Sequence, residues 1–151
     1  MIDEKGNIFL TLSEDREEAL IYTPAGGEIK VLNGQYPREA AVAEVWEETG
    51  LKLSEQDLVH IGDPQLILPT PEYDLYDGVG ILISSYLHTG KWNLNDIVLN
   101  KEPEKDCMIV DTVLLPLPCS MREIDSWDIN IYPNFAAKLL ELNQLLREGK
   151  I

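Results

Sequence analysis

Three glutamates are the residues of this chain whose type and spacing best suit chemistry. Glu44, Glu47 and Glu48 stand at positions i, i+3 and i+4, so a helix would bring their carboxylates to one face. Like charges at this spacing destabilise an isolated helix by about 0.2–0.5 kcal/mol per pair, and a bound cation would relieve the repulsion. Hard divalent ions such as Mg²⁺ or Mn²⁺ prefer oxygen ligands and leave positions open to substrate phosphate. The cluster therefore predicts a metal site for phosphoryl chemistry, although solvated glutamates on a good helix former have the same spacing.

The helix that would carry these glutamates has clear start and stop signals. Pro37 suits the first helical position and Gly50 suits the left-handed residue that ends a helix, which predicts a helix over 37–49. Tyr36 stands where Ser, Thr or Asp would normally cap the free amides, so the start is imperfect. A second helix is predicted at about 133–148, because apolar residues repeat there at i, i+4, i+7 and i+11: Phe135, Leu139, Leu142 and Leu146.

Apolar, β-prone stretches separated by turn residues predict the strands of the fold. The order of strands, helix, strands and helix predicts the α+β class with a mixed or antiparallel sheet. No linker interrupts the chain, so residues 1–151 are predicted to form a single domain. The predicted strands lie in 7–12, 19–23, 58–68, 79–87 and 108–115, and the third stretch holds two runs divided by Gly62-Asp-Pro64.

The composition excludes several kinds of partner. Twelve Lys and Arg stand against 27 Asp and Glu, a formal net charge of −15, so the protein's own field opposes non-specific binding to nucleic acid. The sequence has no apolar window long enough to span a bilayer and no signal-peptide pattern, which predicts a cytoplasmic protein that does not bind membranes. Cys107 and Cys119 are predicted to be reduced thiols, and His60 and His88 to be structural residues without chemistry.

The helix and the turn before it together resemble the Nudix hydrolases. The family's box is written G-x5-E-x7-R-E-U-x-E-E-x-G-U, where U is apolar, and Glu44-Val-Trp-Glu-Glu-Thr-Gly-Leu51 matches its second half completely. Pro24-Ala-Gly-Gly27 resembles the turn that precedes the box, and Asp3-Glu-Lys-Gly6 resembles an Asp-x-x-Gly hairpin lead-in. The resemblance covers most of the chain.

The resemblance implies a fold and an activity. It implies a Nudix-type α/β/α sandwich with a mixed sheet, in which Glu44, Glu47 and Glu48 of the first helix are the metal ligands and catalytic residues. The implied cofactor is Mg²⁺ or Mn²⁺. The implied reaction is cleavage of a diphosphate linkage in a nucleoside di- or triphosphate or a related nucleoside-diphosphate-X compound. Glu44 is the first choice for the residue that serves as, or orients, the base for water.

Further site residues are expected on two loops. Backbone groups around Gly26 and Gly27 are expected to meet the metal or the diphosphate, because the missing side chains allow close approach. The stretch Glu102-Pro-Glu-Lys105 resembles a loop that supplies an additional carboxylate in several family members, which makes Glu104 a further candidate metal ligand. A solvated charged loop is an equally good interpretation of that stretch.

Two departures from the box define the alternative functions. Gln35 aligns with the first Glu of the box after an insertion of two residues, and Ala43 replaces its Arg. Gln supplies no carboxylate and Ala supplies no guanidinium, so a structural ion pair is predicted to be lost from both ends. The alternative is a Nudix-fold binding or regulatory domain with impaired or no catalysis, and a third possibility is an acidic interaction protein with no site.

The beginning of the chain suggests how the protein associates. The family usually has a strand before the Asp-x-x-Gly turn, whereas only Met1 and Ile2 precede it here. An uncovered strand edge pairs readily with another chain. The run 7–12 is therefore expected to be available for pairing, with upstream residues or with a second copy of this chain in a homodimer.

Overall fold

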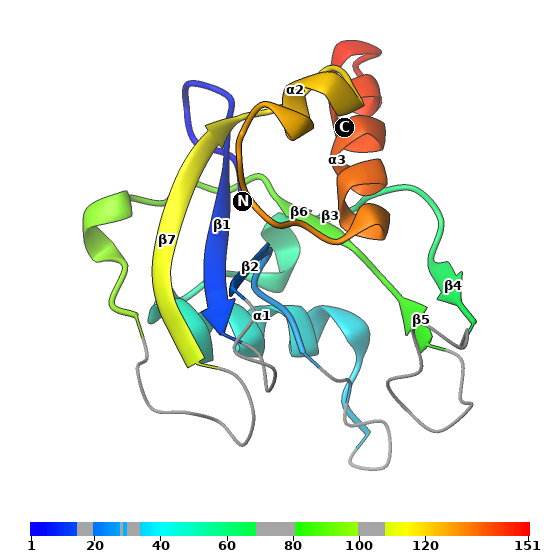
Figure 1. The fold of residues 1–151 in the computed structure, drawn as a ribbon. Coiled ribbons are helices and arrows are strands. Elements are labelled where there is room, and N and C mark those ends of the chain that lie inside the picture. The colour runs from blue at the N-terminus through cyan, green and yellow to red at the C-terminus, as the bar shows by residue number, and fades with distance from the viewer. Residues whose placement is uncertain (15–19, 28, 30–33, 69–80, 100–107) are drawn as a thin grey trace.

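A computed structural model describes most of the chain, and it is built from antiparallel strands and three α-helices (Figure 1). The described residues are 1–14, 20–27, 29, 34–68, 81–99 and 108–151. No helix within these residues is long and apolar enough to cross a membrane.

A three-stranded antiparallel sheet forms the centre of the molecule. Strand β1 (Asn7–Glu14) lies between β2 (Leu20–Thr23) and β7 (Met108–Pro116), in the order β2-β1-β7. β7 pairs with β1 along its whole length, with a register shift between Leu12 and Ser13, and β2 pairs with its last four residues. The predicted strands 7–12, 19–23 and 108–115 are therefore confirmed, with β1 ending two residues and β7 one residue later than predicted, and β2 described from Leu20.

The central position of β1 corrects the expectation of an open edge at 7–12. One side of this run is paired with β7, and on the other side the pairing with β2 reaches only as far as Thr11, which lies opposite Thr23 at the end of β2. Nearer the start of the strand, the N–H of Phe9 donates to the carbonyl of Met1, and Ile2 bridges Ile8. The first two residues thus cover the edge that was expected to need another chain, which removes the reason for expecting a homodimer through this segment.

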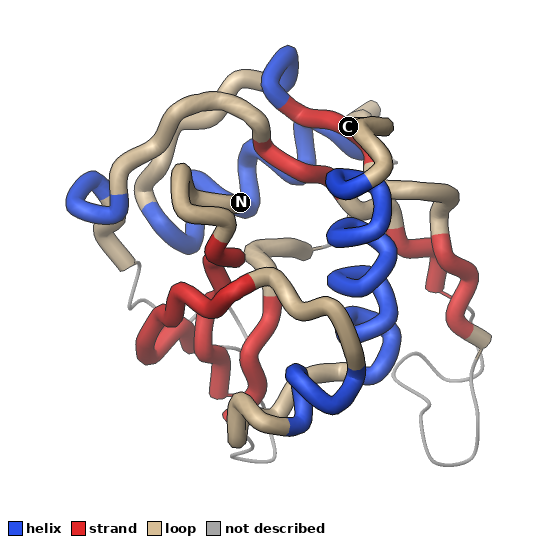
Figure 2. Tube along the Cα trace, turned by 90° about the horizontal axis from the view of Figure 1, so that it is seen from above, coloured by secondary structure: helices blue, strands red, loops and turns tan. Residues whose placement is uncertain are grey.

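Two short two-stranded sheets complete the described β-structure. β3 (Leu58–His60) pairs with β6 (Tyr86–His88), and β4 (Gln65–Ile67) pairs with β5 (Ile81–Ile83). The β4–β5 pair lies at the periphery in both views (Figures 1 and 2). The stretch 79–87 was predicted as one strand, but its described part lies in two strands, β5 and β6, which belong to different sheets. An apolar run in the sequence does not show where a strand leaves one partner for another. All named strand pairs of the described residues are antiparallel, so the predicted mixed sheet is reduced to one isolated parallel bridge between Tyr22 and Ile131.

Helix α1 (Pro37–Thr49) has the predicted bounds. Pro37 occupies the first turn, and Gly50 ends the helix in the left-handed conformation at φ 70°, which is cheap only for glycine. Tyr36 gives no side-chain cap, as expected, but its N–H donates to the Glu39 carboxylate at 2.9 Å. That bond satisfies an amide at the helix start and compensates for the poor cap.

The remaining helices follow the last strand. α3 (Pro133–Arg147) agrees with the predicted C-terminal helix, whereas α2 (Met121–Asp125) was not predicted. Two 3₁₀ turns lie beside the β3–β6 pair in the chain: η2 (Glu55–Asp57) directly precedes β3, and η3 (Leu94–Asp96) follows β6.

The two long helices contact opposite faces of the central sheet. Ile8 and Leu10 pack with Leu139 of α3 in the main apolar cluster. The next residue, Thr11, points to the other face and meets Glu48 of α1. Figure 1 shows α1 beside the carboxyl-terminal half of β1, with α3 on the other side of the strands. The sheet therefore fixes α1 at one end of β1, and this contact positions the glutamates.

Candidate active site

Helix α1 carries the three glutamates in its last two turns. Glu44, Glu47 and Glu48 are each partly buried. Ala40, earlier in the same helix, is buried. The sequence therefore places a carboxylate cluster where it is partly removed from water.

The loop of residues 24–27 lies against these carboxylates. The backbone N–H of Gly26 donates to Oε1 of Glu48 at 3.1 Å. A Cβ built at Gly27 would overlap the carboxylate group of Glu44, so the absence of a side chain there is what admits this glutamate. Each of the two glycines predicted for the site thus lies against one of the predicted glutamates, Gly26 against Glu48 and Gly27 against Glu44. Both pairs are more than 15 residues apart in sequence.

Glu48 is in the most unusual environment of the three glutamates. Its Oε2 lies 3.4 Å from the hydroxyl of Thr11, a residue of β1 with no exposed surface. The pKa of Glu48 is raised to about 7, mainly by burial and also by the negative charges of Glu44 and Glu47, while the hydrogen bonds from Gly26 and Thr11 act to lower it. The carboxyl group is therefore poised to gain or lose a proton near neutral pH.

The carboxylate oxygens of this site are of the type that hard divalent cations prefer as ligands. They lie beside a backbone turn without side chains, and their mutual repulsion is a cost that a cation would remove. Within the described part of the chain, no three carboxylate, imidazole or thiol side chains form a group that would hold a metal ion. Mg²⁺ is commonly held by only one or two carboxylates together with substrate phosphates, so Glu44 and Glu48 remain a suitable protein contribution.

The other expected ligand lies outside the described residues. Glu104, together with its neighbour Glu102, belongs to the stretch 100–107, for which nothing is described. The described part of the site therefore comprises the α1 glutamates, the turn at Gly26 and Gly27, and Thr11.

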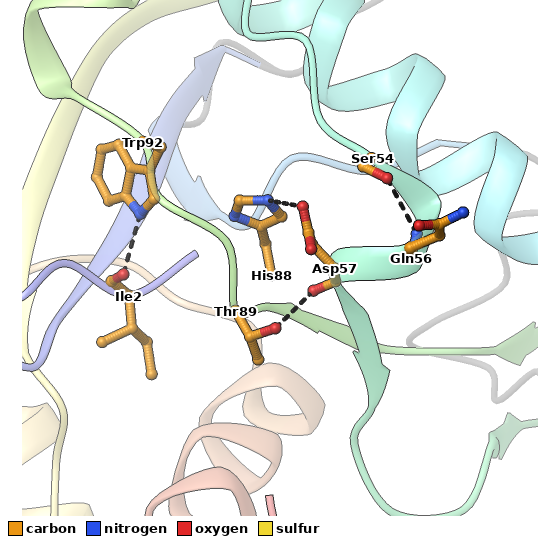
Figure 3. A network of polar contacts seen from close by, with 7 residues as sticks. All are labelled: Ile2, Ser54, Gln56, Asp57, His88, Thr89 and Trp92. Carbon is orange, nitrogen blue, oxygen red and sulfur yellow. Dashed lines mark hydrogen bonds and ion pairs between the residues drawn. The ribbon is translucent and has the colours of Figure 1, made fainter.

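A second polar network surrounds His88, at the end of β6 (Figure 3). Its Nε2 lies 3.9 Å from Oδ2 of Asp57, and the hydroxyl of Thr89 donates to the Asp57 carbonyl at 3.0 Å. Burial lowers the pKa of His88, the positive charge of the amino terminus lowers it further, and Asp57 opposes both effects. The lowered pKa of the buried His88 favours its neutral form, and the hydrogen bond from Thr89 joins η2 to the residue that follows β6.

Sequence reasoning missed Thr11. The contact between Thr11 and Glu48 joins residues 37 positions apart, and no local spacing or turn signal could indicate it. The only available signal was a hydroxyl in the middle of an otherwise apolar strand, since a buried hydroxyl needs a hydrogen-bond partner.

No protein-family model matches the chain, and no curated protein matches it.

Proposed function

We propose that this protein is a metal-dependent pyrophosphohydrolase of the Nudix type, which cleaves a diphosphate linkage in a nucleoside di- or triphosphate or a related nucleoside-diphosphate-X compound. The observation that carries the proposal is the contact of α1 with the glycine turn. Glu48 accepts the N–H of Gly26, and the Glu44 carboxylate occupies the space beside Gly27. These are the two sequence elements on which the resemblance rests.

Each residue of this site has a role that its surroundings support. Glu44 and Glu48, with Glu47 beside them, would hold Mg²⁺ or Mn²⁺. A divalent cation bound there would neutralise the charge of the diphosphate and polarise its phosphorus–oxygen bond. Gly26 orients Glu48 through its N–H, and Gly27 leaves room for Glu44. One carboxylate of the same cluster would serve as the base for water, or orient that base, and Glu44 is the first choice.

A pyrophosphatase screen tests the proposal directly. Nucleotides, nucleotide sugars, ADP-ribose and dinucleoside polyphosphates are incubated with the protein and Mg²⁺ or Mn²⁺, and phosphate or pyrophosphate release is measured. The proposal expects turnover that needs the metal and disappears in Glu48→Gln, while the exposed Glu4→Gln behaves as the unmodified protein. Absence of metal-dependent release for every compound would overturn it.

One observation favours a binding or regulatory domain as the second candidate. Gln35 and Ala43 stand where the box has a carboxylate and a guanidinium, and no three-ligand metal group is formed by the described side chains. A protein of this kind would bind Mn²⁺ and a nucleoside diphosphate without hydrolysing it. Calorimetric binding of ADP with Mn²⁺, without release of phosphate, would favour this candidate over the hydrolase.

A further inference from the structure

The hydroxyl of Thr11 joins the centre of the sheet to the carboxylate cluster. Thr11 lies in the second half of β1, with Thr23 of β2 opposite it on one side and Thr112 of β7 on the other. Its side chain is fully buried, so its hydroxyl has no access to bulk water. Such a group must find its partners within the protein.

The hydroxyl of Thr11 has two acceptors and one proton. The carbonyl of Thr23 lies 3.2 Å from Oγ1, and Oε2 of Glu48 lies 3.4 Å from the same atom. A hydroxyl donates only one hydrogen, and donation to an ionised carboxylate is the stronger of the two bonds. Thr11 is therefore placed to hold the negative form of Glu48 in one orientation.

The carboxylate of Glu48 accepts hydrogen bonds from two sides. The N–H of Gly26 reaches Oε1 from the loop, and the hydroxyl of Thr11 reaches Oε2 from the strand. Two donors on the two oxygens of one carboxylate define the plane of that group, whereas one donor would leave it free to rotate. Because β1 is paired on both sides, its donor has a fixed position relative to α1.

We infer that Thr11 is a positioning residue, which orients the Glu48 carboxylate for cation binding through its hydroxyl. This inference deepens the proposed function and rests on it for the identity of the bound ion. Groups that orient metal ligands affect metal affinity by about 10–100-fold when they are removed. The strand thus contributes to the site without touching the metal or the substrate.

The test compares variants that differ only in the hydroxyl. Thr11→Ala and Thr11→Ser both lose the methyl group, but only Ser keeps the donor, and Thr11→Val keeps the shape without the donor. Thr112→Ala is the matched control on the neighbouring strand, directly opposite Thr11. Affinity for Mn²⁺ alone is measured by electron paramagnetic resonance. Thr11→Ala and Thr11→Val are expected to bind Mn²⁺ about tenfold more weakly, with Thr11→Ser and Thr112→Ala within about twofold of the unmodified protein.

A second readout makes the inference independent of metal binding. The carboxyl carbon of Glu48 is followed by ¹³C NMR in metal-free protein at about pH 9, with Glu48→Gln to assign the resonance. The resonance is expected to move in Thr11→Ala and Thr11→Val and to stay in place in Thr11→Ser and Thr112→Ala. If the unmodified protein binds no Mn²⁺, the proposed function fails and this resonance alone decides the role of Thr11. Equal effects of Ala and Ser at Thr11, or an unmoved resonance in Thr11→Val, would overturn the inference.

Discussion

Two ionisable side chains that are shielded from water, the partly buried Glu48 on α1 and the buried Lys138 on α3, lie in opposite electrostatic surroundings. The ammonium group of Lys138 has three acceptors: the carbonyl of Ile61 at 3.1 Å, the carbonyl of Asp63 at 3.3 Å and the carboxylate of Glu141 at 2.7 Å. Glu48 also has hydrogen-bond donors, but its nearest charges are the carboxylates of other glutamates. One charge is matched by its surroundings, and the other is opposed by them.

This difference separates a charge that the protein itself neutralises from one that it leaves unneutralised. A buried charge is tolerated when opposite charge and hydrogen bonds replace water, and Lys138 fulfils all three of its donor positions in this way. It fastens α3 to the chain on both sides of Gly62, where a Cβ would overlap the Glu141 carboxylate. Glu48 is held in a state that costs stability, and such a state is typical of binding and catalytic sites.

The largest expected effect is on activity at Glu48. Glu48→Gln keeps the size of the side chain and removes its charge, so metal-dependent turnover is expected to fall by more than about a hundredfold while the fold is retained. Turnover is measured with the substrate found in the screen, and folding by circular dichroism. Unmodified activity in this variant would mean that the cluster is not part of the mechanism.

The second effect is on stability at Lys138. Lys138→Met keeps the aliphatic stem but leaves two carbonyl groups and a carboxylate without their cation, so a loss of about 3–5 kcal/mol in unfolding free energy is expected. Lys150→Met is the matched control, since Lys150 also pairs with a glutamate, Glu148, but is 63% exposed. The control is expected to change stability by less than about 1 kcal/mol. Urea unfolding measures both free energies. Equal losses in the two variants would mean that the buried Lys138 contributes no more to stability than an exposed lysine.

The sequence predicted the site more completely on α1 than elsewhere. The bounds of α1 follow from local signals, namely the proline at its start and the glycine at its end. The resemblance to the box singled out Glu44, Glu48 and the glycine turn, although it predicted that the glycines meet the metal or the diphosphate, not the glutamates. The surroundings of Lys138 and the role of Thr11 could not be predicted, because their partners are distant in sequence and depend on how the strands pair.

Helix α2 illustrates a different kind of miss. Ser120 caps this helix by accepting the N–H of Glu123, and the Glu123 carboxylate accepts the N–H of Cys119. A serine followed three residues later by a glutamate is a local signal for a helix start. The signal was present in the sequence, but the helix is only five residues long and has no apolar periodicity to support it.

The third prediction concerns pH. Burial raises the pKa of Glu48 from a reference of 4.5 to about 7, so the folded protein binds more protons than the unfolded chain between these values. Stability from this group is therefore fully present below about pH 4.5 and is lost as pH rises towards 7, by on the order of 2–3 kcal/mol. In metal-free protein, Glu48→Gln should be more stable than the unmodified protein at pH 8 and lose this advantage at pH 4. Thermal unfolding at both pH values measures it, and a pH-independent difference would contradict it.

The fourth prediction separates the two glycines of the turn. In Gly27→Ala the new Cβ must displace the Glu44 carboxylate, so Mn²⁺ affinity is expected to fall by about tenfold. In Gly26→Ala the new Cβ meets only the carbonyl of Pro24 at 3.9 Å, an ordinary contact, and the N–H to Glu48 is kept. That variant should therefore bind Mn²⁺ as the unmodified protein does. Weaker Mn²⁺ binding in Gly26→Ala than in Gly27→Ala would contradict the close contact between Gly27 and Glu44.

The smallest expected effect comes from giving the α1 glutamates an oppositely charged neighbour, as Lys138 has in Glu141. Ala43→Arg places a cation four residues before Glu47, and such a pair stabilises a helix by about 0.2–0.5 kcal/mol. Gln35→Glu restores the other box position, and the two changes together should exceed the sum of the single changes in both melting temperature and kcat/KM, because each is expected to need the other as its ion-pair partner. A double-mutant cycle measures this coupling. Strict additivity would mean that Gln35 and Ala43 were lost independently, and that the two-residue insertion before Gln35 has moved this position out of reach of the helix.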